Sequence, residues 1–195
     1  ARAHGRSEGK YIGFGCLDRY DLLCWISYII ERFGDDCEIL LHGISMGGAT
    51  VLMASGLELP NNVKGIISDC AFTSAWEVFV DVLKDMYHIP PYPIINIANS
   101  ISKSIAGYGL NECNSAEEVK KAKVPILFIH GDNDTFVPCS MSKEIYKNCA
   151  SPKALLIVKD AGHAESYYKD TINYEKKVKD FIERYLSNKE VIIND

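Results

Sequence analysis

The chain has 195 residues, of which 47% are hydrophobic and 24% are charged, and its formal net charge is −5 at pH 7. This length suits a single domain that buries a sizeable core. Lysine and arginine form no sustained cluster, which argues against a nucleic-acid interface, and no apolar run is long enough to cross a membrane. We therefore expect a globular domain whose partners are neither nucleic acids nor membranes.

The first predicted element is a helix over residues 17–33, where apolar side chains recur at helical spacing and Gly34 follows. Further along the chain, short apolar segments alternate with helical stretches. The strands are expected over residues 38–43, 63–69, 125–130 and 154–159, and the helices over residues 46–56, 140–149 and 171–187. This alternation predicts an α/β fold, in which helices cover both faces of a parallel sheet. The first helix is expected to pack on the sheet through Leu22, Trp25, Ile26, Ile29 and Phe33.

The segment between the second and third strands is much longer than the dozen or so residues that a crossover between parallel strands needs. Helical patterns over residues 76–86 and 94–105 are separated by Pro90-Pro91-Tyr92-Pro93, which interrupts any helix, and residues 116–122 return the chain to the sheet. We therefore expect a core formed by residues 1–74 and 122–195, and a helical insertion formed by residues 75–121.

A G-x-S-x-G motif, Gly43-Ile44-Ser45-Met46-Gly47, lies between the strand at 38–43 and the helix at 46–56. Such a motif on its own is also found in ordinary glycine-rich turns. Between a strand and a helix it describes a nucleophile elbow, a tight turn that exposes the serine above the sheet. The N-terminus of the following helix then directs backbone N–H groups at the reacting atoms.

Two further polar residues follow buried strands. Asp134 lies in the segment Gly131-Asp132-Asn133-Asp134, and His163 lies in the loop after the last strand. In an open parallel sheet, function belongs at the carboxyl ends of the strands. The chain order Ser45, Asp134, His163 is the order expected of α/β-hydrolases.

Together these motifs resemble the α/β-hydrolase superfamily, and within it the bacterial serine hydrolases of the esterase and prolyl-oligopeptidase-like branch. The matching segments are Arg2-x-His4-Gly5-x-Ser7-x-Gly9, His42-Gly43-x-Ser45-Met46-Gly47-Gly48, His130-Gly131-x-x-Asp134-x-x-Val137-Pro138 and Gly162-His163. The resemblance implies that Ser45 is the nucleophile, His163 the general base and Asp134 the carboxylate that orients it. The N–H of Met46 is expected to be one oxyanion donor.

The reaction implied by the resemblance is hydrolysis of a carboxylic ester or a similar small acyl substrate through an acyl-enzyme at Ser45. Ser-His-Asp chemistry needs no cofactor and no metal, and the sequence contains no metal or nucleotide motif. Peptidases, thioesterases and acyltransferases use the same three residues, so these activities stay open. An inactive fragment or interaction module is the alternative from another class.

In the family, an insertion at residues 75–121 forms a cap over the serine. Trp76 and Tyr108 of this insertion, together with Phe136, are expected to contact the substrate. Other apolar residues expected to shape the pocket are Phe79, Met86, Tyr87 and Ile94. Each of them has packing of the cap as its alternative role.

The family pattern that begins here at Arg2 lies after the fourth strand of the family sheet. The resemblance therefore implies that the first strands, and the second oxyanion donor, belong to a segment upstream of this chain. The strand at 38–43 would then be an apolar sheet edge, and such edges pair with other chains. We expect a dimer, or association through the edge of residues 38–43.

For most of the other acidic residues and histidines we expect structural roles. Asp132 and Asp160 are expected to stabilise turns, whereas Asp69, at the end of the strand at 63–69, is the alternative catalytic acid. We expect His42 and His130 to be packed at strand ends, and His4 and His88 to lie on the surface.

The seven cysteines are an odd number and contain no C-x-x-C pair. This pattern argues against a disulfide framework and against a zinc site. We expect free thiols in a reducing cytosol, and therefore a cytoplasmic protein.

Overall fold

The computed structural model of the chain describes residues 1–186. Its centre is a parallel sheet with the strand order β1-β2-β3-β4. The strands are β1 (Ile39–Ile44), β2 (Val63–Asp69), β3 (Ile126–Gly131) and β4 (Lys153–Val158). All six residues of β3 are buried, as expected of a strand covered on both faces. The predicted α/β fold and its parallel sheet are confirmed.

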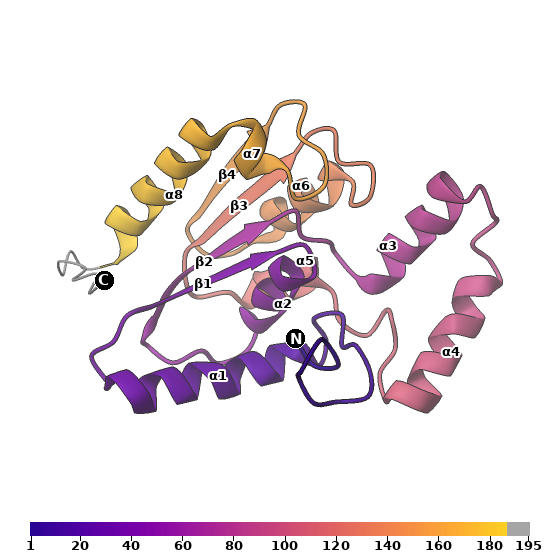
Figure 1. Cartoon of the computed structure of the whole chain (residues 1–195), viewed down its shortest axis with the longest axis horizontal. Coiled ribbons are helices and arrows are strands. Elements are labelled where there is room, and N and C mark those ends of the chain that lie inside the picture. The colour runs from indigo at the N-terminus through magenta and orange to yellow at the C-terminus, as the bar shows by residue number, and fades with distance from the viewer. Residues whose placement is uncertain (187–195) are drawn as a thin grey trace.

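Helices cover both faces of this sheet, as Figure 1 shows. On one face lie α1 (Asp18–Phe33), α2 (Met46–Ala54), α5 (Ser115–Glu118), a 3₁₀ turn at Val119–Lys121 and α6 (Cys139–Asn148). On the other face lie α7 (Ser166–Lys169) and α8 (Thr171–Tyr185). The predicted end of the last helix, residue 187, lies outside the described residues. Neighbouring side chains of β2 pack on opposite faces of the sheet. Ile66 packs with α1 and α2, whereas Ile67 packs with α8.

Helix α1 packs on the sheet through only part of the predicted face, which Leu22 and Ile26 share with the observed one. Ile26 is buried, and Leu22, Leu23 and Ile30 pack beside it. Trp25 and Phe33, which were expected in the packed face, are 64% and 65% exposed. The helix carries apolar residues around most of its circumference, so periodicity alone does not select the buried stripe.

The insertion is helical. It contains α3 (Ala75–Asp81), which continues as one π-helical segment (Val82–Met86), and α4 (Ile94–Ala106). In Figure 1, α3 and α4 project from the end of the sheet at which the strands terminate. Within residues 1–186, every helix is too short or too polar to cross a membrane.

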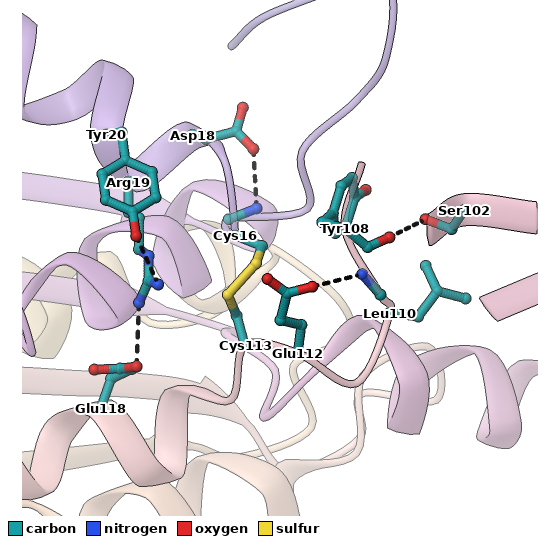
Figure 2. Close-up of a disulfide and its surroundings, with 12 residues drawn as sticks. Cys16, Asp18, Arg19, Tyr20, Ser102, Tyr108, Leu110, Glu112, Cys113 and Glu118 are labelled. Atoms are coloured by element: carbon teal, nitrogen blue, oxygen red, sulfur yellow. Dashed lines mark hydrogen bonds and ion pairs between the residues drawn. A yellow bond between two sulfur atoms is a disulfide. The ribbon is translucent and has the colours of Figure 1, made fainter. Parts of the chain in front are cut away.

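A disulfide joins Cys16, in the loop before α1, to Cys113, just before α5 (Figure 2). The prediction of free thiols was therefore wrong for these two residues. The sulfurs meet although 97 positions separate them, and such a contact leaves no trace in local sequence spacing. Free cysteines in the described part of the chain are Cys24, Cys37, Cys70, Cys139 and Cys149. Disulfides are typical of oxidising compartments, so this bond does not favour the cytoplasmic location that the cysteine pattern predicts.

Candidate active site

Ser45 occupies the turn between β1 and α2 in a conformation that few side chains adopt, with φ 55° and ψ −116°. Gly43 and Gly48 are required by close packing. A Cβ at Gly43 would lie 2.1 Å from the carbonyl oxygen of Gly47, and a Cβ at Gly48 would lie 2.8 Å from the carbonyl oxygen of Asp69. The Ser45 N–H donates to the same Asp69 oxygen at 2.8 Å, which fixes the turn to β2. Strained residues of this kind cluster at functional sites, and the turn has the form of a nucleophile elbow.

The structure brings the three predicted residues together in one hydrogen-bonded chain. The Ser45 hydroxyl lies 2.8 Å from His163 Nε2, and His163 Nδ1 lies 2.7 Å from Asp134 Oδ2. A carboxylate only accepts, so Nδ1 carries the ring proton and Nε2 is left to accept from the hydroxyl. This tautomer is the one that a general base needs.

The carboxylate of Asp134 is completely buried and is held on both oxygens. Its Oδ1 accepts from the backbone N–H groups of Phe136 and Val137, each at 2.9 Å. Burial raises the pKa of Asp134, but hydrogen bonds from His130, His163 and Val137 outweigh this effect and leave it well below the usual range. The group is therefore an anion whose position is fixed.

His130 is a second histidine on this carboxylate, and its contact with Asp134 is absent from the sequence prediction. Its Nε2 lies 3.3 Å from Asp134 Oδ2 and 2.9 Å from the carbonyl oxygen of Val137, while Nδ1 lies 2.6 Å from the Ser142 hydroxyl. The ring is fully buried, in line with its expected packed position. The sequence signal for this contact was the position of His130 near the end of β3, four residues before Asp134.

The rival acids have other partners. Asp69 is bonded to the Ser166 hydroxyl at 3.3 Å and to Tyr174, and burial raises its pKa. Asp132 accepts from the Asp160 N–H at 2.6 Å, which is a turn contact. The hydrogen bond of His163 Nδ1 goes to Asp134 instead.

The remaining histidines lie on the surface. His4 and His88 are exposed as expected, and His42 is exposed on β1 instead of packed. His42 Nε2 lies 3.4 Å from the Tyr174 hydroxyl.

The three predicted substrate contacts have different surroundings. Phe136 is 40% exposed, and its ring centroid lies 5.0 Å from that of His163. Trp76 is half-buried, with its ring centroid 6.4 Å from that of Tyr92. Tyr108 is 3% exposed, its hydroxyl donates to the carbonyl oxygen of Ile12, and burial raises its pKa to about 12. Of these side chains, the structure brings Phe136 beside His163 and places Tyr108 in a packed core.

Cys70 is a further residue that the sequence prediction left out of the site. It follows β2 directly, and its sulfur lies with one nitrogen of His163 and one oxygen of Asp134, all within 4.8 Å of one another. Its position at the carboxyl end of a strand was a signal for it.

A nucleophile elbow and a serine-histidine-aspartate chain at the carboxyl ends of parallel strands define an α/β-hydrolase. Solved structures with this fold include the esterase Pf2001 of Pyrococcus furiosus, at 20% identity and a TM-score of 0.74, covering 95% of this chain and 69% of that one. An acylaminoacyl peptidase of Pyrococcus horikoshii matches at 21% identity and a TM-score of 0.67, covering 91% of this chain and 29% of that one. The model of the prolyl oligopeptidase family matches residues 16–189, and the chain belongs to that family.

Two bacterial relatives are longer than this chain. The uncharacterized protein YqkD of Bacillus subtilis is 32% identical over 182 residues, which are 93% of this chain and 60% of YqkD. The uncharacterized protein YfhR of Escherichia coli K12 is 27% identical over 169 residues, which are 85% of this chain and 52% of YfhR. The chain thus spans about half to three fifths of the length of these relatives. The predicted family is confirmed, and membership supports a hydrolase.

Proposed function

We propose that the protein is a serine hydrolase that cleaves a carboxylic ester or a similar small acyl substrate. The observation that carries this proposal is the continuous hydrogen-bonded chain from Ser45 through His163 to Asp134. In isolation a serine hydroxyl is a weak nucleophile, and a base in contact with it removes the proton as attack develops.

In the proposed mechanism, His163 Nε2 takes the proton of Ser45 while the oxygen attacks the substrate carbonyl. The protonated ring then passes this proton to the leaving group, and the acyl-enzyme remains on Ser45. Asp134 stabilises the charged ring without accepting its proton. The N–H of Met46, at the N-terminus of α2, stabilises the negative charge on the carbonyl oxygen. Water activated by His163 completes the cycle.

The insertion of residues 75–121 is proposed as a cap on this site, with Trp76 and Phe136 as substrate contacts. The test of the function is hydrolysis of p-nitrophenyl butyrate, compared between the chain and its Ser45→Ala variant. A peptidase is the second candidate, because one solved structure with this fold is an acylaminoacyl peptidase. An acetyl-alanine p-nitroanilide separates the two, since it contains an amide in place of the ester.

We also propose that the chain associates through the outer edge of β1. Within the described residues β1 pairs with β2 alone, and Ile44 is 49% exposed on it. A groove of about 930 Å³ runs beside this edge, lined by residues that include Arg2, Trp25 and His42. Unpaired apolar edges favour pairing with a further strand.

A charge placed in this groove is expected to prevent the association. Light scattering should give the mass of a dimer for the chain and of a monomer for Trp25→Lys, because a lysine ammonium resists burial against an apolar partner. Tyr168→Lys is the matched control, since Tyr168 is 81% exposed on α7, across the sheet from α1. A chain that is monomeric at every concentration contradicts the proposal.

A further inference from the structure

Cys70 is a buried sulfur that the proposed mechanism does not use. It is fully buried, adopts φ 43°, and donates its backbone N–H to the carbonyl oxygen of Ile129 at 2.9 Å. Its sulfur, a His163 nitrogen and an Asp134 oxygen lie within 4.8 Å of one another. These three atoms are a thiol sulfur, an imidazole nitrogen and a carboxylate oxygen, which are the donor types that zinc accepts.

The surroundings of the sulfur favour the neutral thiol unless a cation pairs with it. Burial raises the pKa of the Cys70 thiol to about 12, so the thiol is protonated when no cation is present. The nearby backbone N–H groups of Ser45 and Ala164 act in the opposite direction and offset part of this effect. A metal ion deprotonates a coordinating thiol outright, and these N–H groups would then stabilise the resulting thiolate.

We propose that Cys70, Asp134 and His163 form a site for Zn²⁺ whose occupation switches off the hydrolase. The inhibition rests on the proposed function, whereas the binding of Zn²⁺ does not. A thiolate and a carboxylate together offset the charge of the ion, so the buried site is neutral when filled. His130 and two backbone N–H groups already hold the carboxylate, which is the outer-shell support that metal ligands need.

The spacing of the ligands is compatible with a tetrahedral ion after a small shift. His163 Nδ1 and Asp134 Oδ2 are 2.7 Å apart across the present hydrogen bond. Zinc at about 2.0–2.2 Å from nitrogen and oxygen and about 2.3 Å from sulfur requires the ligand atoms to be roughly 3–4 Å apart. In the proposed site the ion takes the place of the Nδ1 proton, and the ligand atoms, which now lie within 4.8 Å of one another, move to these spacings. Water fills the fourth position.

The proton balance explains the inhibition. The Cys70 thiol proton goes to solvent as the sulfur–zinc bond forms, and nothing is oxidised or reduced. Zinc on Nδ1 leaves the neutral ring with its proton on Nε2. Nε2 then donates a hydrogen bond to Ser45 instead of accepting one, so it cannot remove the hydroxyl proton.

Binding is tested with Zn²⁺ itself, by competition with a chromophoric chelator in buffer free of thiols. We expect one bound ion for the unaltered chain. Cys70→Ala and Cys70→Ser should bind more than about tenfold more weakly, because even outer-shell changes cost about 10- to 100-fold in affinity. Cys149→Ala is the matched control, since Cys149 is also buried and free and bonds with Ser151. Cd²⁺ should give an ultraviolet sulfur–metal band that both Cys70 variants lack.

Inhibition is tested by adding Zn²⁺ to the ester assay and removing it with a chelator, with each variant normalised to its own metal-free rate. We expect reversible loss for the unaltered chain and for Cys149→Ala, and resistance for both Cys70 variants. Ser45→Ala should still bind Zn²⁺, because it keeps all three ligands. If the unaltered chain binds the ion but hydrolyses no ester, the proposed function is wrong and the zinc site stands. If the Cys70 variants bind Zn²⁺ as tightly as the unaltered chain, the proposed site is wrong. If binding depends on Cys70 but does not inhibit hydrolysis, His163 is not a ligand.

Discussion

Ser45→Ala is expected to lower kcat/KM for p-nitrophenyl butyrate by about 10⁴- to 10⁶-fold. The substitution removes the oxygen that lies 2.8 Å from His163 Nε2, so no acyl-enzyme forms. Binding and the oxyanion donor are left in place, and these account for the residual rate. The measurement is the initial rate of p-nitrophenolate release at matched enzyme concentrations.

The control for this variant is Ser27→Ala. Ser27 is an exposed serine on α1 whose hydroxyl donates to the carbonyl oxygen of Leu23, so its removal should leave the rate unchanged. Circular dichroism of Ser45→Ala must show a folded chain. More than a tenth of the starting rate in folded Ser45→Ala would contradict the role of Ser45, and a chain without any turnover contradicts the proposed function.

The core of the fold was predictable because its signals are local. A strand buried on both faces reads as a continuous apolar run, and β3 is of this kind. The nucleophile elbow was predictable for the same reason, since its motif is contiguous in sequence and Gly43 is imposed by a contact with Gly47 that a Cβ would break. Asp134 and His163 lie in the loops that follow β3 and β4, so strand order alone places them at one edge of the sheet.

The remaining features depend on contacts between distant segments. The buried stripe of α1 was only partly predicted, because Trp25 and Ile26 are both apolar in sequence and only packing against β1 and α2 separates them. The contact of His130 with Asp134 depends on how the loop after β3 folds back. The Cys16–Cys113 bond depends on where the insertion returns to the core.

This disulfide closes the insertion onto the core. Cys16 and Cys113 are each 5% exposed and share an apolar cluster with Tyr108, whose hydroxyl donates to the carbonyl oxygen of Ile12. The bond and this hydrogen bond tie the end of the insertion to the loop before α1, as Figure 2 shows for the bond and its neighbours. Ser45 comes between the two cysteines in the sequence, so the nucleophile elbow lies inside the loop that the disulfide closes.

Replacement of both cysteines, Cys16→Ser with Cys113→Ser, is expected to lower the free energy of unfolding by about 2–5 kcal/mol. The sequence separation of 97 residues makes the closed loop long, which places the entropic effect near the upper end of this range. Urea denaturation measures it as a fall in the midpoint, compared at equal slope. A reductant should destabilise the unaltered chain and leave the double variant unchanged.

The same variant should lose structure unevenly. Helix α4 belongs to the insertion that the disulfide ties to the core, whereas α8 packs on the far face of the sheet through Tyr174 and Phe181. Amide hydrogen exchange should therefore speed up in α4 more than in α8. Cys24→Ser, at an exposed free cysteine, is the matched control. Titration of seven thiols in the denatured, unreduced chain would contradict the bond, because a formed disulfide leaves five of the seven cysteines free.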